Sequence, residues 1–374
     1  MTILIKAGIA IAAAGGLIVA VSQCARHVQQ RTGDDGFPLP RTASPNFDGR
    51  RFRNAAATTI SKPGTLLRSA AEFITGGQVR RPPVAPGPFR LDAAPAAGPA
   101  HDGLRITWMG HSSALIEIGG KRFLTDPVWS DRASPVGFAG PQRFFAPPCA
   151  IEELPPLDGV IISHDHYDHL DRETVTRLAA RGVDFYVPLG VGPILAGWGV
   201  PQRQIRELDW WAEAPLGPTH RLVATPAQHF SGRLFINGNG TLWCSWVIIG
   251  PAHRVFFGGD GGMFDGFAEI GRRYGPFDVT MLEIGAYHHN WRDIHLGPHL
   301  AIDAHLALRG KALLPIHWGT FTLAFHDWDA PIRELIDAAA PRGIALLAPA
   351  PGAAIIPDGT SRISRWWERD GSAL

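Results

Sequence analysis

The chain has 374 residues, of which 45% are apolar, and a formal net charge of +1. This length allows one large core or two modest ones, and the 43 glycines and 32 prolines favour short elements and turns over a helical bundle. No run rich in lysine and arginine stands out, which argues against a nucleic-acid-binding protein. Cys24, Cys149 and Cys244 are isolated from one another, so neither a disulfide framework nor a cysteine zinc site is expected.

A hydrophobic segment dominates residues 1–24. Residues 7–22 are sixteen residues without a charge, longer than most signal-peptide cores and slightly shorter than the ~20 residues of a spanning helix. If Lys6 reaches the interface, residues 2–22 could just cross a bilayer. We therefore expect an uncleaved membrane anchor or a cleaved export signal. Arginine greatly outnumbers lysine, which indicates a coding bias like that of GC-rich bacteria. An anchor or export signal in such a cell places the chain in the inner membrane or the periplasm, and a cytoplasmic location is less expected.

Residues 25–100 are rich in proline, alanine and glycine. The stretches PLPRTASPNF, RRPPVAPGPF and LDAAPAAGPA predict a linker and an irregular lead-in, interrupted by a short helix over residues 64–77. After residue 100 the sequence becomes a regular alternation of apolar elements. We therefore expect one domain over residues 101–374.

Strands and helices alternate along this domain. Three short strands joined by glycine turns are expected over residues 104–110, 113–120 and 121–126. A buried strand over 157–164 precedes a helix over 172–182, with Asp171 as its candidate N-cap. Further strands are expected over residues 183–190, 205–210, 221–227, 242–250, 253–260, 278–285, 311–319 and 344–352. Further helices are expected over residues 193–199, 298–310 and 331–343. This order predicts a layered α/β domain in which helices cover two sheets.

The segment ISHDHYDHLD, residues 162–171, places three histidines directly after an apolar strand. His164 and His166 can present their rings on one side of an extended segment, and Asp168 and His169 can address a second metal ion after a turn. Imidazole and carboxylate are ligand types that zinc accepts. Three histidines have no packing rationale here, so the motif predicts a dinuclear metal site.

A dinuclear site needs more ligands, and three predicted strands end on suitable residues. His229 follows one strand, Asp260 ends another between glycines that permit close backbone approach, and His317 ends a third. Each residue alone could be an ordinary polar side chain. Together with the histidine motif, they complete a set of seven candidate ligands.

The chain resembles the metallo-β-lactamase-fold hydrolases, and among them the N-acyl-phosphatidylethanolamine-hydrolysing phospholipase D branch. The resemblance runs from about residue 47 to residue 330 and is carried by SHDHYDHLD, TPAQHFSGR, GGDGG, EIGAY and IHWGTF. It implies an αββα sandwich, with two mixed sheets covered by helices, and two zinc ions per chain. The implied ligands are His164, His166 and His229 for the first ion, Asp168, His169 and His317 for the second, and Asp260 as the bridge.

The resemblance also implies roles for residues around the metals. Asp126 would orient a ligand imidazole, and His111 would support the site structurally. His295 and His305 would contact the substrate or support the ligands. A hydroxide held between the two zinc ions would attack the substrate. The residues implied in catalysis are Asp168, Asp260 and His295.

The implied activity is that of a zinc-dependent phospholipase D-type phosphodiesterase acting on N-acyl-phosphatidylethanolamine-like membrane phospholipids. An N-terminal membrane segment suits such a substrate. Two alternatives stay open: hydrolysis of another small ester, lactone or phosphodiester, because the pocket walls set specificity, and a degenerate binding protein without turnover. The intact ligand set argues against the second. One departure concerns substrate choice, because Glu283 stands where the resemblance leads us to expect proline, and a carboxylate is unfavourable beside an anionic substrate.

Overall fold

The computed structural model describes residues 41–60, 72, 75–93, 100–233 and 238–368. The segment 1–24, where we expect an anchor or an export signal, lies outside these residues, as does most of the helix expected over 64–77. Within the described part of the chain, no helix has the length and apolar character needed to cross a bilayer.

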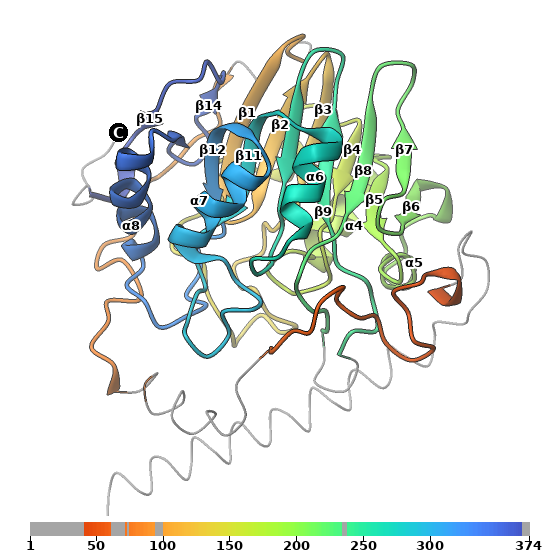
Figure 1. Cartoon of the computed structure of the whole chain (residues 1–374), viewed down its shortest axis with the longest axis horizontal. Helices are drawn as coiled ribbons and strands as arrows, with labels where there is room; N and C mark the ends of the chain where they lie inside the picture. Colours follow the sequence, from red (N-terminus) through yellow and green to blue (C-terminus); the bar gives the residue numbers. More distant parts are fainter. Residues whose placement is uncertain (1–40, 61–71, 73–74, 94–99, 234–237, 369–374) are drawn as a thin grey trace, which may run out of the picture.

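Two mixed β-sheets form the centre of the domain (Figure 1). The seven-stranded sheet has the order β14 (Ala354–Ile355), β1 (Leu104–Gly110), β2 (Ser113–Ile118), β3 (Lys121–Thr125), β4 (Gly159–Ile161), β5 (Phe185–Pro188) and β6 (Ile205–Leu208). The eight-stranded sheet has the order β15 (Arg362–Ile363), β13 (Ala345–Ala348), β12 (Gly310–Ile316), β11 (Phe277–Glu283), β10 (Arg254–Phe257), β9 (Ser245–Ile249), β8 (Arg221–Thr225) and β7 (Glu213–Pro215). Each sheet has an antiparallel part, β14 with β1–β3 and β7–β10, and a parallel part, β3–β6 and β10–β13 with β15.

Helices cover the outer faces of both sheets. In Figure 1, α6 (Gly266–Tyr274), α7 (Gly297–Ala307) and α8 (Ala330–Ala339) lie in front of the eight-stranded sheet. The fainter α4 (Arg172–Ala180) and α5 (Gly192–Gly197) lie behind, and their buried residues share a core cluster with β3, β4 and β5. The fold is therefore an α/β sandwich of two mixed sheets between helices, consistent with the layered architecture that we expected.

Strand β2 shows how the sequence builds these layers. Ala114, Ile116 and Ile118 belong to the core between the sheets, whereas Leu115 belongs to the cluster shared with α4 and α5. Side chains alternate along a strand, so a continuous apolar run is buried on both faces. Each such leucine or isoleucine contributes about 1.5–3 kcal/mol through burial.

Most expected elements are present, but α6 was not foreseen. It contains Gly266 and Gly271, and glycine inside a helix costs about 1 kcal/mol relative to alanine. A side chain at position 271 would come within 2.4 Å of the carbonyl oxygen of Ala307 in α7. Close packing of α6 on α7 therefore requires a glycine at position 271. Because glycine disfavours helices, the same residue makes α6 difficult to predict from the sequence.

Asp171 precedes α4 as expected, but its side chain makes no capping hydrogen bond. Its carboxylate instead accepts hydrogen bonds from the backbone N–H of Ser130 and the hydroxyls of Ser130 and Thr174. Asp171 thus ties the start of α4 to the loop after β3.

Two described parts of the proline-rich lead-in, residues 41–60 and 75–93, pack against the domain. Phe52 is fully buried, and Phe89 is 7% exposed with its ring 4.9 Å from that of Phe145. Both phenylalanines belong to the core between the sheets. The core therefore continues across the boundary expected at residue 101.

Candidate metal centre

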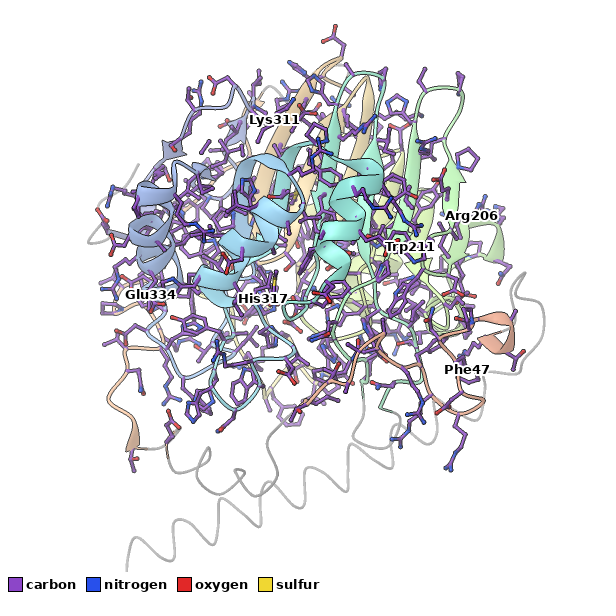
Figure 2. All side chains as sticks on the ribbon, in the orientation of Figure 1. Phe47, Arg206, Trp211, Lys311, His317 and Glu334 are labelled. Carbon is purple, nitrogen blue, oxygen red and sulfur yellow. The ribbon has the colours of Figure 1, made fainter. Side chains whose placement is uncertain are left out.

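The candidate ligands gather where several strands end. The histidine motif follows β4, Asp260 lies three residues after β10, and His317 directly follows β12. Figure 2 shows Lys311 and His317 at opposite ends of β12, with His317 at the lower edge of the sheets in that view. Residues from distant parts of the sequence meet at this edge because the parallel strands share one direction.

Three imidazoles, those of His164, His166 and His229, form the first group. The Nε2 atom of His164 lies 2.8 Å from Nδ1 of His166, and Nε2 of His229 lies 3.3 Å from the same Nδ1. Ligand atoms about 2.0–2.1 Å from one zinc ion are roughly 3.3 Å apart in a tetrahedron. The spacing of these three nitrogens therefore fits a shared metal ion.

The second group comprises Asp168, His169 and His317, with Asp260 beside it. The Nε2 atom of His317 lies 3.2 Å from Oδ2 of Asp168 and 3.1 Å from Oδ2 of Asp260. Oδ1 of Asp260 lies 3.2 Å from Nε2 of His169, and its Oδ2 lies 3.8 Å from Nε2 of His229. Asp260 thus faces ligands of both groups, the place of a bridging carboxylate.

The charges in the second group favour a cation. Burial alone would lower the pKa of His317, but Asp260 and Asp168 outweigh it and raise the pKa to about 10. Burial is likewise outweighed at His169, where Asp260 and Asp168 raise the pKa well above its usual value. Within the described residues, Nε2 of His169 and Oδ1 of Asp260 are buried without a hydrogen-bond partner. The donor set therefore fits a metal ion, which would replace protons on the two imidazoles.

Asp126 lies fully buried behind the ligands, as the orienting role requires. Its Oδ2 is 2.7 Å from Nδ1 of His169, and its Oδ1 accepts a hydrogen bond from the backbone N–H of Ser163. The hydroxyl of Ser163 donates to Asp126 and lies 2.9 Å from Nδ1 of His164. Asp126 and Ser163 therefore orient one imidazole of each metal group.

His111 contacts the second group directly. Its Nε2 lies 3.0 Å from Oδ2 of Asp168, and its ring centroid lies 4.2 Å from that of His317. Burial, reinforced by the nearby His317, lowers the pKa of His111 to about 3, so its imidazole is neutral. A neutral ring can donate from Nε2 to the Asp168 carboxylate.

His295 approaches both groups. Its ring centroid lies 5.3 Å from that of His229 and 5.6 Å from that of His317. Its Nδ1 lies 2.6 Å from Oε2 of Glu283. Burial would lower the pKa of His295, but Glu283 and then Asp260 outweigh it and raise the pKa.

The Glu283 carboxylate is buried and bonded to donors of the protein. It is 1% exposed at the end of β11, and its Oε1 accepts hydrogen bonds from the backbone N–H groups of Gly261 and Leu296. Together with Nδ1 of His295, these donors face the carboxylate. Glu283 therefore links the Asp260 loop to the His295 loop.

His305 does not join this cluster. It is buried on α7, with Nδ1 2.7 Å from the hydroxyl of Thr280, and a side chain at Gly310 would collide with its ring. Gly310 begins β12, whereas His317 follows its end. His305 therefore packs α7 against the sheet, away from the ligands.

Sequence reasoning passed over Ser163 and the inward role of Glu283. Ser163 stands directly before His164 within the motif, so its position was a usable signal. Glu283, the last residue of β11, occupies the same kind of strand-end position as His317 after β12. Only its partners show that it orients other groups.

The fold and this ligand cluster define the chain as a metal-dependent hydrolase of the metallo-β-lactamase superfamily. Residues 121–318, more than half of the chain, match the family described as "Beta-lactamase superfamily domain", and the chain belongs to it. The chain is 37% identical over 254 residues to the N-acyl-phosphatidylethanolamine-hydrolyzing phospholipase D 1 of Caenorhabditis elegans, covering 64% of this chain and 71% of that one. The resemblance to that branch is thereby confirmed.

Two further comparisons bear on the family and the fold. The chain is 48% identical over 338 residues to an uncharacterized protein of Mycobacterium tuberculosis, covering 87% of each. The solved structure of Igni18, a metallo hydrolase from the archaeon Ignicoccus hospitalis, matches with a TM-score of 0.52 and 23% identity, covering 67% of this chain and 97% of that one. The likeness to Igni18 supports the fold alone.

Proposed function

We propose that the protein is a zinc-dependent phosphodiesterase of phospholipase D type that hydrolyses N-acyl-phosphatidylethanolamine-like phospholipids. The observation that carries this proposal is the position of Asp260, which faces His169 and His317 on one side and His229 on the other. Two ligand groups that share one carboxylate suit a two-metal hydrolase. The relative from Caenorhabditis elegans, named for this activity, supports the choice of substrate class.

The proposed ligands of two zinc ions follow from the two groups. When bound, the ions would lower the pKa of a water molecule and withdraw charge from a phosphoryl oxygen. The chain's own contribution is to fix the ligands, through Asp126 and Ser163 behind the imidazoles and His111 beside Asp168. The first ion would be held by His164, His166 and His229, the second by Asp168, His169 and His317, and Asp260 would contact both.

His295 is the proposed proton donor to the leaving group. Because Nδ1 donates to Glu283, Nε2 is the nitrogen free to serve a substrate. The raised pKa of His295 favours the doubly protonated ring, in which Nε2 also carries a proton that it can donate as a general acid. Cleavage between phosphorus and the distal oxygen leaves an alkoxide, which needs such a proton.

A hollow beside His317 provides the proposed substrate pocket. Its walls combine aromatic and aliphatic side chains with one guanidinium, and the lining includes Arg80, Trp318, Phe321, Leu323, His326 and Trp328. Apolar walls with a few polar groups are typical of ligand sites, and arginine is suited to phosphate. This lining supports a substrate that combines an anionic group with an apolar part.

Isotope labelling tests the proposal. Zinc-loaded protein is incubated with N-acyl-phosphatidylethanolamine in heavy-oxygen water, and the products are analysed by mass spectrometry. Attack at phosphorus predicts label in phosphatidic acid and none in the released N-acylethanolamine. Label in a free fatty acid would instead identify an esterase, and turnover of lactones alone would identify the other hydrolase class. Fully metallated protein that turns over no substrate in such a panel would identify a binding protein.

A further inference from the structure

The lead-in reaches the metal centre through Asn54. This residue lies well before residues 121–318, the part that matches the superfamily domain. Its side-chain Nδ2 donates to the carbonyl oxygen of His229 at 2.7 Å, and its Oδ1 accepts from the backbone N–H of His229 at 3.1 Å. One carboxamide therefore satisfies both backbone groups of a candidate metal ligand.

The second sheet does not hold His229 itself. The pairing of β8 with β9 ends at Thr225 and Ser245, four residues before His229 in the chain. Beyond that point the His229 backbone bonds to Asn54, while Nδ1 of its ring lies 3.0 Å from the carbonyl oxygen of Ile294. These contacts fix the backbone and the ring plane, and together they set the position of Nε2.

Asn54 is itself firmly held. The indole N–H of Trp243 donates to its Oδ1 at 3.0 Å, and the preceding residues are anchored by the backbone bonds from Phe52 to Asn239 and from Arg53 to Asn46. Phe52 is fully buried, with its ring 4.9 Å from that of Phe47. A fixed carboxamide can impose its geometry on a loop.

We propose that Asn54 is a positioning residue for the metal centre, through which the lead-in completes the His164–His166–His229 group. The proposal rests on the metal assignment made above. Asn54 touches no reacting atom and acts only through the His229 backbone. Partners that orient metal ligands typically change metal affinity about 10- to 100-fold when they are replaced.

The test measures zinc affinity by chelator competition, and metal content, for the full chain and three variants. Asn54→Ala removes the contact, whereas Asn54→Asp keeps the volume and the acceptor oxygen but sets a carboxylate oxygen against the His229 carbonyl. Arg53→Ala is the matched control, because the Arg53 side chain is 73% exposed and pairs with Asp48 at the surface. Cobalt substitution adds an absorption spectrum that reports the ligand geometry.

We expect both Asn54 variants to lower the affinity for one of the two zinc ions about 10- to 100-fold and to change the cobalt spectrum. The affinity for the other ion should stay unchanged, and the Arg53→Ala protein should match the wild type in both affinities. If Asn54→Ala does not fold, the isosteric Asn54→Asp carries the same prediction. Wild-type affinity for both ions in a folded Asn54 variant, with one ion lost in His229→Ala, would overturn the inference alone. A wild-type chain that binds no zinc would overturn the metal assignment as well.

Discussion

Glu283 and His295 lie in contact at the metal centre, and substitution of Glu283 tests the proposed role of His295 as a general acid. In Glu283→Gln, the carboxamide oxygen can still accept from Gly261 and Leu296, but its NH2 group would face Nδ1 of His295 and could not stabilise the positively charged imidazole that donates the proton. We expect kcat to fall about 10- to 100-fold, with KM and metal content nearly unchanged. Steady-state kinetics combined with metal analysis provide the measurement.

The control for this substitution is Glu213→Gln, which neutralises a glutamate that pairs with Arg221 at the surface. The double variant Glu283→Gln/His295→Ala should be no slower than His295→Ala alone, since Glu283 acts through His295. Losses that multiply in the double variant, or a Glu283→Gln protein with full activity, would contradict the coupling.

The two metal groups should respond differently to pH. In the metal-free protein the pKa of His317 is about 10 and that of His169 is also raised. Both imidazoles are therefore doubly protonated and positively charged near neutrality. Burial lowers the pKa values of His164 and His229, so their rings are already neutral. Metal binding must displace protons from the second group only.

Metal affinity at the second group should fall as the pH falls, because protons compete with the metal for these imidazoles. Between about pH 6 and 9, affinity at the second group should rise about tenfold per pH unit for each proton released, and affinity at the first group should change little. Zinc titration in weakly buffered solution should release one to two protons with one of the two equivalents. Equal pH dependence at both sites would show that the charges are distributed differently.

The ligands could be predicted from the sequence because they belong to a local motif or end a strand. His164, His166 and His169 lie within six residues of one another, and His317 directly follows an apolar strand. The positioning contacts could not be predicted in this way. Asn54 and His229 are 175 residues apart, and neither hydrophobic period nor turn chemistry encodes such a pair.

The lead-in segment around Arg80 contributes to the wall of the pocket through the Arg80 side chain. The hydroxyl of Thr322 donates to the Arg80 carbonyl oxygen at 2.9 Å. The backbone N–H of Val79 donates to the Asp327 carboxylate, and the Val79 carbonyl oxygen accepts from the backbone N–H of Trp328. The segment thus fixes the backbone on which the guanidinium stands.

Replacement of Arg80 should discriminate between substrates by charge. A hydrogen bond to a charged group contributes about 1.5–3 kcal/mol, so Arg80→Gln should lower kcat/KM for an anionic phosphodiester about 10- to 100-fold. A neutral carboxyl ester, if hydrolysed at all, should be nearly unaffected. The neighbouring Arg81→Gln is the control, because Arg81 lies over the ring of Phe144 and bonds to the Gln142 carbonyl. Equal losses on both substrates would indicate a structural role for Arg80.

Periodicity predicted the regular elements well where burial is uniform. Strands such as β10 contain a run of buried apolar residues, Val255 to Phe257, and α8 shows one apolar face. It failed where packing overrides propensity, as at Gly271 in α6, and where a strand has little burial, as in β7 (Glu213–Pro215). The packing of the lead-in against the domain was not predicted either, because its high proline content indicates a linker although Phe52 and Phe89 are buried.

Across the whole molecule, both sheets and the lead-in contribute residues to the candidate metal centre and its supporting contacts. Asn54 bonds to His229, and the backbone N–H of Thr59 donates to Asp293, next to Ile294 and His295. Residues 41–60 therefore belong to the catalytic unit in space. A truncated chain that is meant to keep the site must retain them.

The hydrophobic segment, residues 7–22, should determine how the chain partitions between membrane and solution. The sixteen uncharged residues 7–22 predict that the full-length chain partitions with membranes, whereas a chain that starts at Arg31 stays in the supernatant and keeps its zinc affinity. Ala14→Asp sets a charge at the middle of this stretch, which costs about 2.5–3.5 kcal/mol at the centre of a membrane helix, and Ala14→Ser is the matched control.

Carbonate extraction and mass determination separate the outcomes. A full-mass chain that resists extraction, and is released by Ala14→Asp but not by Ala14→Ser, establishes an anchor. A shortened chain that lacks the segment identifies an export signal instead. Sedimentation of the chain that starts at Arg31 would count against the segment as the membrane determinant. It would direct attention to exposed apolar residues elsewhere, Val79 and Val84 in the lead-in and Phe138 in the domain, the last of them 75% exposed. Because the substrate class is proposed to reside in a bilayer, attachment through residues 7–22 should also raise turnover on vesicles without changing turnover of a dispersed phosphodiester.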